Sequence, residues 1–155
     1  MNISKNVGVL DVGKSNIKLS ACNYFGKVLD TLSTPNEICD EKPWKYHNLE
    51  KTNIWVLENL SYFSKKYNLK HFISAGHGSG LVFVGEDIDK NNDGTSLPMI
   101  DYEQSMPEDI DRAYEKLCGD FYDRGSKIMG SASHAARQMF WAETVEPDKF
   151  NNSKW

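Results

Sequence analysis

Residues 7–22, which read V-G-V-L-D-V-G-K-S-N-I-K-L-S-A-C, decide the fold. A short apolar run from Val7 to Leu10 ends at Asp11, and from Ile17 onward apolar and polar residues alternate with the period of a strand. Gly13 falls between the two halves, where a tight turn is expected. The pattern predicts two antiparallel strands joined by a short hairpin, with a carboxylate at its mouth.

Residues 8–15 also satisfy the phosphate-loop pattern G-x-x-x-x-G-K-[ST], but their context argues against a phosphate-loop NTPase. A phosphate loop follows a strand and opens a helix, so that its backbone N–H groups surround the phosphates. Here residues 9–12 are strand-like, Asp11 would repel a phosphate, and residues 16–19 alternate like a strand. We therefore expect a second strand after the turn and keep the NTPase as a third hypothesis.

The predicted hairpin has two further interpretations. Asp11 at its mouth could hold a hydrated Mg²⁺, an ion that keeps several waters and commonly binds one or two carboxylates plus substrate phosphates. Gly13 would let backbone N–H groups approach a phosphate, and Lys14 and Ser15 would add donors. The alternative is an ordinary hairpin turn without a ligand. The hairpin alone does not decide between them.

Working outward, residues 27–33 predict a third strand, which completes an antiparallel three-stranded meander. Residues 34–47 contain two prolines and little pattern, so we expect a linker there. Residues 52–67 place apolar side chains on one stripe and predict a helix, with Thr52 as its N-cap and Asn68 as its C-terminal stop.

The rest of the chain is expected to alternate strands and helices. The expected elements are a buried strand at residues 71–75, a glycine-rich loop at 76–80, a hairpin with arms at 81–84 and 97–102, and helices at 107–121 and 134–144. Asp87, Asp89, Asn91 and Asp93 resemble the start of a calcium loop, but Ile100 stands where that loop needs Glu. We therefore expect a polar hairpin tip.

The composition excludes several classes of protein. The 155 residues contain 18 Lys and Arg against 22 Asp and Glu, and 39% are hydrophobic, which suits one domain with a buried core. No apolar run approaches the roughly 20 residues of a membrane helix, and the acidic balance favours no nucleic acid, so we expect neither as a partner. Three cysteines without metal spacing (Cys22, Cys39, Cys118) and the lack of a signal-peptide pattern predict a cytoplasmic protein.

Four segments resemble, in the expected order, the FGGY carbohydrate kinases of the actin-like ATPase superfamily. Residues 11–18 (D-V-G-K-S-N-I-K) are similar to the first phosphate motif of those kinases. Residues 72–82 (F-I-S-A-G-H-G-S-G-L-V) resemble the segment that ends a strand at the sugar pocket, and residues 97–103 (L-P-M-I-D-Y-E) resemble the next sugar-lining strand. Residues 139–150, with M-F-W-A-E followed by E-P and F, resemble a helix of the same domain and the turn after it.

The resemblance implies an α/β, ribonuclease-H-like (actin-like ATPase) domain, in which the meander is followed by alternating helices and strands in a mixed sheet. It also implies ATP and Mg²⁺ as cofactors and a small sugar or polyol as substrate. By this resemblance Asp11 is the catalytic and metal-side acid, the phosphate-binding residues are Gly13, Lys14, Ser15 and Asn16, and the substrate-binding residues are His77, Gly78, Tyr102, Glu103 and His134. For His77 and His134 the alternative is a structural role in a loop or at the surface.

Two departures from the family pattern refine this expectation. Many members have Thr or Ser where this chain has Lys14, and His77-Gly78 differs from the Arg-Glu pair of glycerol kinases, which argues against glycerol.

In the family the catalytic base, the second phosphate motif and the adenosine pocket come from later in a longer chain. We therefore expect residues 1–155 to be an incomplete N-terminal domain that lacks the C-terminal domain and is inactive alone. A homodimer through an exposed sheet edge or apolar surface is a further expectation. The alternative is a non-catalytic sugar-binding or regulatory module.

Overall fold

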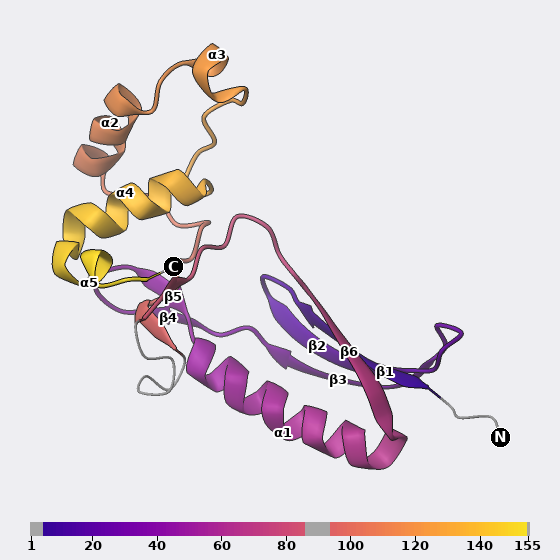
Figure 1. The fold of residues 1–155 in the computed structure, drawn as a ribbon. Coiled ribbons are helices and arrows are strands. Elements are labelled where there is room, and N and C mark those ends of the chain that lie inside the picture. The colour runs from indigo at the N-terminus through magenta and orange to yellow at the C-terminus, as the bar shows by residue number, and fades with distance from the viewer. Residues whose placement is uncertain (1–4, 86–93, 155) are drawn as a thin grey trace. The chain divides into compact units, whose positions relative to one another are not determined.

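The computed structural model describes residues 5–85 and 94–154, which form two compact units. The first unit contains Met1–Glu37 and Asn48–Gly78, and the second contains Ile38–His47 and Ser79–Trp155. The chain therefore passes from one unit to the other at three points along its length. Element labels below are those of Figure 1.

The first unit is built on a four-stranded mixed sheet with the order β3-β2-β1-β6. Strands β1 (Asn6–Val12), β2 (Asn16–Cys22) and β3 (Val28–Pro35) are antiparallel neighbours, and β6 (Leu69–Gly76) runs parallel to β1. The three-stranded meander and the mixed sheet predicted from the sequence are therefore confirmed.

Helix α1 (Leu49–Tyr67) packs on one face of this sheet. Its Phe63 is buried against the inward-facing side chains of β1 and β2, among them Leu10 and Leu19. The prediction of Thr52 as N-cap was wrong: the Asn48 side chain accepts from the Lys51 backbone N–H at 3.0 Å, so the helix begins one turn earlier. Asn68 ends the helix in the left-handed conformation as predicted, with φ 51°.

Two strand predictions need correction. Strand β6 was expected to be buried, yet its residues 70–76 are exposed and Ile73 is 59% exposed. Among the described residues β6 pairs only with β1, so it lies at the edge of the sheet. Residues 34–47 were expected to be a linker, yet β4 (Ile38–Asp40) and β5 (Lys45–His47) pair as a two-stranded sheet. Strands of three residues are too short to show a period in the sequence.

In its described residues, the second unit combines two small sheets with four helices. Its elements are β4, β5, β7 (Phe83–Val84), β8 (Thr95–Leu97), α2 (Glu108–Leu117), α3 (Phe121–Arg124), α4 (Ala135–Val145) and α5 (Pro147–Asn151). Strands β7 and β8 confirm a hairpin with shorter arms than predicted. Residues 87–93 of its expected tip at 87–95 lie outside the described residues. The predicted helix 107–121 ends at Leu117, because Gly119, at φ 70°, and the N-cap Asp120 start a separate turn.

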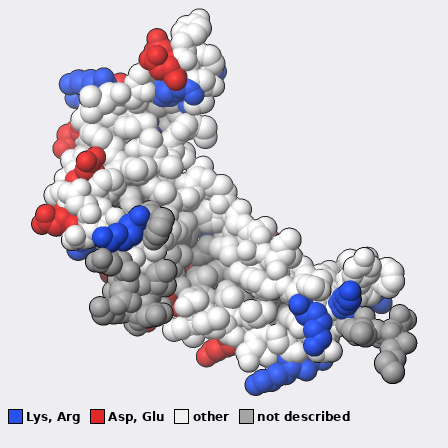
Figure 2. All heavy atoms as spheres, viewed as in Figure 1, with Lys and Arg blue, Asp and Glu red and all other residues white. Residues whose placement is uncertain are grey.

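An aromatic cluster centres the core of the second unit. Trp44, next to β5, packs edge-on against Trp141 of α4 with ring centroids 5.6 Å apart, and its indole N–H donates to the Pro98 carbonyl at 3.0 Å. Phe83 and Ile100 are buried in the same cluster. Within residues 5–85 and 94–154 no helix is both long and apolar enough to cross a bilayer. On the face drawn in Figure 2, charged side chains of both signs lie in small separate groups.

Candidate functional site

The β1–β2 hairpin forms the turn that the sequence predicts. The Gly13 N–H donates to the Asn16 carbonyl at 3.0 Å, and β2 starts at once, so no helix follows Ser15. Asn36, which follows β3, stabilises the turn with two hydrogen bonds. Its side-chain amide donates to the Gly13 carbonyl and its backbone N–H donates to the Ser15 carbonyl, both at 2.9 Å. The phosphate-loop interpretation therefore fails on geometry. The sequence alone did not indicate a role for Asn36.

Glycine is required at position 13 because of a close backbone approach. A Cβ added there would lie 2.8 Å from the backbone oxygen of Asn16, closer than real Cβ atoms come. The clashing atom belongs to the backbone and accepts the hydrogen bond that closes the turn, so no side-chain movement relieves the contact. The narrow turn leaves Ser15 and Asn16 exposed and Lys14 half-buried beside the end of β1.

The end of β6 brings His77 to the same place. The His77 backbone N–H donates to the Val12 carbonyl at 2.9 Å, which extends the parallel pairing of β6 and β1 by one residue. In this register Asp11 pairs with Ala75. The structure thus gathers Asp11, the turn at residues 13–16, and His77 with Gly78 at the carboxyl ends of two adjacent parallel strands. In α/β proteins such an edge is where ligands commonly bind.

Asp11 and Lys18 place opposite charges at this edge of the sheet. Asp11 is exposed, and Lys18 lies opposite it in the β1–β2 register. Within the described ranges no group of three or more His, Cys, Asp and Glu residues could hold a metal by itself. A metal at this edge would therefore take Asp11 as its one carboxylate and complete its shell from water and phosphate, which is the usual habit of Mg²⁺.

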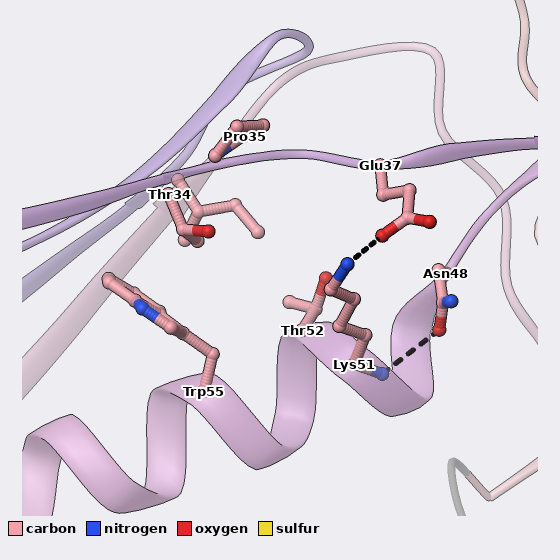
Figure 3. A pocket seen from close by; sticks show the side chains of 8 residues that line it. Thr34, Pro35, Glu37, Asn48, Lys51, Thr52 and Trp55 are labelled. Carbon is pink, nitrogen blue, oxygen red and sulfur yellow. Dashed lines mark hydrogen bonds and ion pairs between the residues drawn. The ribbon is translucent and has the colours of Figure 1, made fainter.

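A small pocket in the first unit is lined by none of the predicted site residues. It has a volume of about 40 Å³ and is lined by Ile17, Thr34, Pro35, Glu37, Asn48, Lys51, Thr52 and Trp55. Figure 3 shows Lys51 reaching from the first turn of α1 to an ion pair with Glu37, beside the Asn48 cap. Space for one or two waters, next to an ion pair already made, indicates a local packing feature rather than the substrate site.

Tyr102 and Glu103 lie in the second unit on a turn and not on the predicted strand. The buried Asp101 side chain accepts from the Glu103 backbone N–H at 3.1 Å, and the Gln104 N–H donates to the Asp101 carbonyl at 3.2 Å. The expectation that the hairpin arm continues through residue 102 was therefore wrong, since β8 ends at Leu97. Short-range hydrogen bonding by the aspartate side chain favours the turn.

Two glutamines that sequence reasoning missed connect the segments of the second unit. Gln138 of α4 donates through Nε2 to the carbonyls of Ser79, at 2.6 Å, and Ala132, at 2.7 Å. The Ala132 N–H in turn donates to the Gln104 carbonyl at 3.0 Å. The glycine-rich loop, the turn that carries Tyr102 and the segment before α4 are thereby tied together. The available signal was a glutamine on the same helix face as Trp141.

His134 is the N-cap residue of α4, although its side chain makes no capping hydrogen bond. Its Nε2 is buried and has no hydrogen-bond partner among the described residues. Arg137, one turn further, pairs with Asp111 and donates through Nη1 to the Met129 carbonyl at 2.9 Å. Burial lowers the pKa of the Arg137 guanidinium, and the Tyr114 ring covers it at 5.4 Å. Arg137 therefore braces α2 against α4.

The predicted site residues fall into two sets. Asp11, Gly13, Lys14, Ser15, Asn16, His77 and Gly78 lie together in the first unit, and Tyr102, Glu103 and His134 lie in the second.

Comparison with known proteins supports a single fold. No protein family matches the chain, and no curated protein does. Among solved structures, a carbohydrate kinase from Novosphingobium aromaticivorans matches 97% of this chain with a TM-score of 0.84 and 24% identity. A xylulose kinase from Rhodospirillum rubrum matches 96% with a TM-score of 0.70 and 15% identity, and a gluconate kinase from Lactobacillus acidophilus 97% with 0.67 and 13%.

The match covers only part of each of these proteins. The chain spans 31% of the Novosphingobium kinase, 32% of the xylulose kinase and 30% of the gluconate kinase, about a third of their length. The fold expected from the resemblance is confirmed, with its antiparallel meander, mixed sheet and ribonuclease-H-like class. This chain therefore has the fold of a part of these carbohydrate kinases, about a third of their length.

Proposed function

We propose that the chain is the N-terminal part of an ATP-dependent carbohydrate kinase that phosphorylates a hydroxyl group of a small sugar or polyol. The observation that carries the proposal is the meeting of Asp11, the turn at residues 13–16 and His77 at the ends of β1 and β6. The fold shared with carbohydrate kinases supports the interpretation of this group of residues as part of a kinase site.

On the phosphate side, the hairpin supplies donors and a carboxylate. The exposed turn offers the side chains of Ser15 and Asn16 and the half-buried Lys14 to phosphate oxygens. Asp11 would hold Mg²⁺, which when bound would neutralise charge on the phosphates of ATP. Phosphoryl transfer depends mainly on such positioning and charge stabilisation. A turn held by the hydrogen bond from Asn36 would keep the phosphate-binding groups in fixed positions.

On the substrate side, His77 and Gly78 of the first unit would contact hydroxyl groups. The resemblance predicts the same kind of contact for Tyr102, Glu103 and His134 of the second unit. An imidazole can both donate and accept, which matches the two-way hydrogen bonding of a sugar hydroxyl. We assign no catalytic base within this chain, because the obvious carboxylate, Asp101, is buried and holds its own turn. The chain alone is therefore expected to show no turnover.

The test combines turnover with binding. Coupled measurement of ATP consumption by the purified 155-residue chain, with pentoses, deoxyhexoses and polyols, is expected to show no rate above background. Turnover would refute the assignment of the base to a later part of the protein. Calorimetry with the same sugars separates the alternatives, since tight binding by this chain favours a non-catalytic sugar-binding or regulatory module.

A phosphate-loop NTPase gives a different pattern in the same assays. It would bind Mg²⁺–ATP without a sugar and lose that binding on Lys14→Ala. Under our proposal Lys14→Ala weakens nucleotide contacts only in part, because the exposed turn offers further donors.

We also propose self-association through the sheet of the first unit. The exposed edge strand β6 carries apolar side chains, among them Ile73 at 59% exposure, and such edges attract a further strand or a second copy. We place the protein in the cytoplasm, which the three free cysteines support.

A further inference from the structure

The turn between β2 and β3 presents two exposed aromatic side chains. Tyr24 is 73% exposed and Phe25 is 90% exposed, and their rings meet edge-on with centroids 5.8 Å apart. The Asn23 side-chain oxygen accepts from the backbone N–H groups of Phe25 and Lys27, both at 3.0 Å. These bonds order the backbone of the turn in the free chain, so little conformational entropy is lost when the turn binds a partner.

Lysines surround this turn at one end of the first sheet. The β1–β2 register pairs Val7 with Cys22, which places the start of β1 beside the β2–β3 turn. The end of α1 lies there too, because the Asn6 side-chain amide donates to the Tyr67 carbonyl at 2.6 Å. The exposed lysines of this end are Lys5, Lys27, Lys65, Lys66 and Lys70. Only Lys66 among them forms an ion pair with a described residue, and Figure 2 shows blue side chains gathered at this end of the first unit.

A groove of about 250 Å³ in the second unit lies between the end of α2, α4 and α5. The residues that line it are Tyr114, Leu117, Cys118, Ala136, Met139, Phe140, Glu143 and Phe150. Leu117 is 72% exposed and Met139 is 45% exposed, so the apolar wall is open to water. Glu143 is the only charged residue of the lining and forms no ion pair with the residues that the structure describes. Because a cavity of about 150 Å³ holds a benzene ring, the groove has room for one aromatic side chain.

The two units carry opposite net charge. The sequence of the first unit contains eight lysines against five Asp and Glu, whereas that of the second contains ten Lys and Arg against 17 Asp and Glu. The net charge of −4 for the whole chain hides this division. Opposite charge on two surfaces attracts them to each other and disfavours contacts between like surfaces.

We propose that the β2–β3 turn of one molecule docks in the groove between α2, α4 and α5 of a second copy of this chain. The Phe25 ring enters among the apolar side chains of the lining, and the neighbouring Lys27 pairs with Glu143. Neither Lys27 nor Glu143 has another ionic partner among the described residues. Aromatic side chains that fill a pocket on the partner are typical anchors of protein interfaces.

A second copy accounts for both surfaces at once. The turn offers an aromatic ring beside a cation, and the groove offers space for a ring beside an anion. A nucleic acid or an anionic bilayer would attract the lysines but would leave the open apolar groove without a role. Because the turn and the groove lie in different units, the contact joins unlike surfaces, so association continues past a dimer unless a ring closes. The contact does not depend on the proposed kinase activity.

Exchange of the two paired charges tests the contact in the full 155-residue chain. Lys27→Glu and Glu143→Lys change exposed side chains, so both variants are expected to fold. In each variant alone the turn and the groove carry charge of the same sign, and light scattering is expected to show association about tenfold weaker than wild type. In an equimolar mixture each turn meets a groove of opposite charge on the other variant, so the wild-type mass is expected to return.

A second pair of variants tests the aromatic ring. Phe25→Ser keeps the backbone hydrogen bond to Asn23 and is expected to weaken association by about tenfold, because the buried ring is lost. Tyr122→Ser is the matched control, since Tyr122 is 92% exposed on α3 and belongs to neither surface, and it leaves the mass unchanged.

A mixture of the charge variants that regains the wild-type mass, with Phe25→Ser weakened and Tyr122→Ser unchanged, supports the contact. A mixture that associates no better than its two components would overturn it, as would equal masses for Phe25→Ser and Tyr122→Ser. A wild-type chain that stays monomeric at every concentration would also overturn it, and binding of that monomer to phosphatidylserine vesicles through Phe25 would assign the turn to a bilayer instead. None of these outcomes bears on sugar phosphorylation, which the ATP-consumption assay tests separately.

Discussion

Substitution of Gly13 by alanine tests the hairpin most directly. The new Cβ would lie 2.8 Å from the Asn16 backbone oxygen, the acceptor that closes the turn. The turn must open to accommodate it, which strains the Gly13–Asn16 hydrogen bond and disturbs both bonds from Asn36. We therefore expect Gly13→Ala to destabilise the hairpin and displace the groups proposed to meet phosphate.

The magnitude follows from three contributions. Loss of the closing hydrogen bond costs about 1 kcal/mol. Distortion of the turn backbone costs about 1–3 kcal/mol. Alanine has less conformational entropy than glycine in the unfolded chain, which stabilises the folded state by about 0.4–1 kcal/mol. The net expectation is a loss of about 1–3 kcal/mol in the free energy of unfolding.

Two measurements check this value. Urea unfolding gives the change in stability, and hydrogen exchange at the Asn36 amide reports the hairpin by itself, because that amide donates to Ser15. Gly78→Ala is the matched control, since a Cβ there meets no atom within 4 Å and its backbone lies outside the left-handed region. A Gly13→Ala chain as stable as the control, with equal protection at Asn36, would refute the steric argument.

Three other perturbations follow from the same structure. Hydrogen bonds from Tyr67, at 2.6 Å, and Lys66, at 3.0 Å, lower the pKa of Asp30 below its ordinary 3.8. The stabilisation is therefore present above pH 3.8 and lost as pH falls through the lowered pKa, so Asp30→Asn should destabilise the chain more near neutral pH than in acid. An equal deficit at neutral and acid pH would contradict this. Ile73→Lys should reduce the mass measured by light scattering if the β6 surface mediates self-association, whereas a wild-type chain that is already monomeric would disprove that contact. Asp11→Asn should diminish the broadening that Mn²⁺–ATP causes in amide signals of residues 11–16, and unchanged broadening would exclude Asp11 as the metal-side acid.

Local patterns predicted the meander and the end of α1 well because the β1–β2 and β2–β3 pairings join residues close in sequence. The alternation after Ile17 and the turn at Gly13 determine the meander, and Asn68 ends α1 by its own backbone preference. The exposure of β6 could not be predicted this way. An apolar run looks the same whether or not a second strand pairs with its outer side, so residues 71–75 indicated a strand and not its burial.

The site was predicted in part for the same reason. Asp11 and His77 lie in segments with clear patterns, and parallel pairing of β1 with β6 brings them together. The roles of Asn36 and Gln138 depend on hydrogen bonds to backbone carbonyls far away in the sequence, which no local pattern encodes. Gln138 was visible only as a polar residue on an apolar helix face.

The position of β4 and β5 in the second unit has a consequence for synthesis of the chain. Residues 38–47 leave the ribosome early, yet Trp44 packs on Trp141 and donates to Pro98, which are translated much later. The Trp44 side chain is therefore synthesised before the residues it packs against, and strands β1–β3 and helix α1 are already complete before those residues appear. A gene segment that encodes residues 79–155 alone would lack Trp44 from its core, so this unit cannot be moved between proteins by a single fusion point.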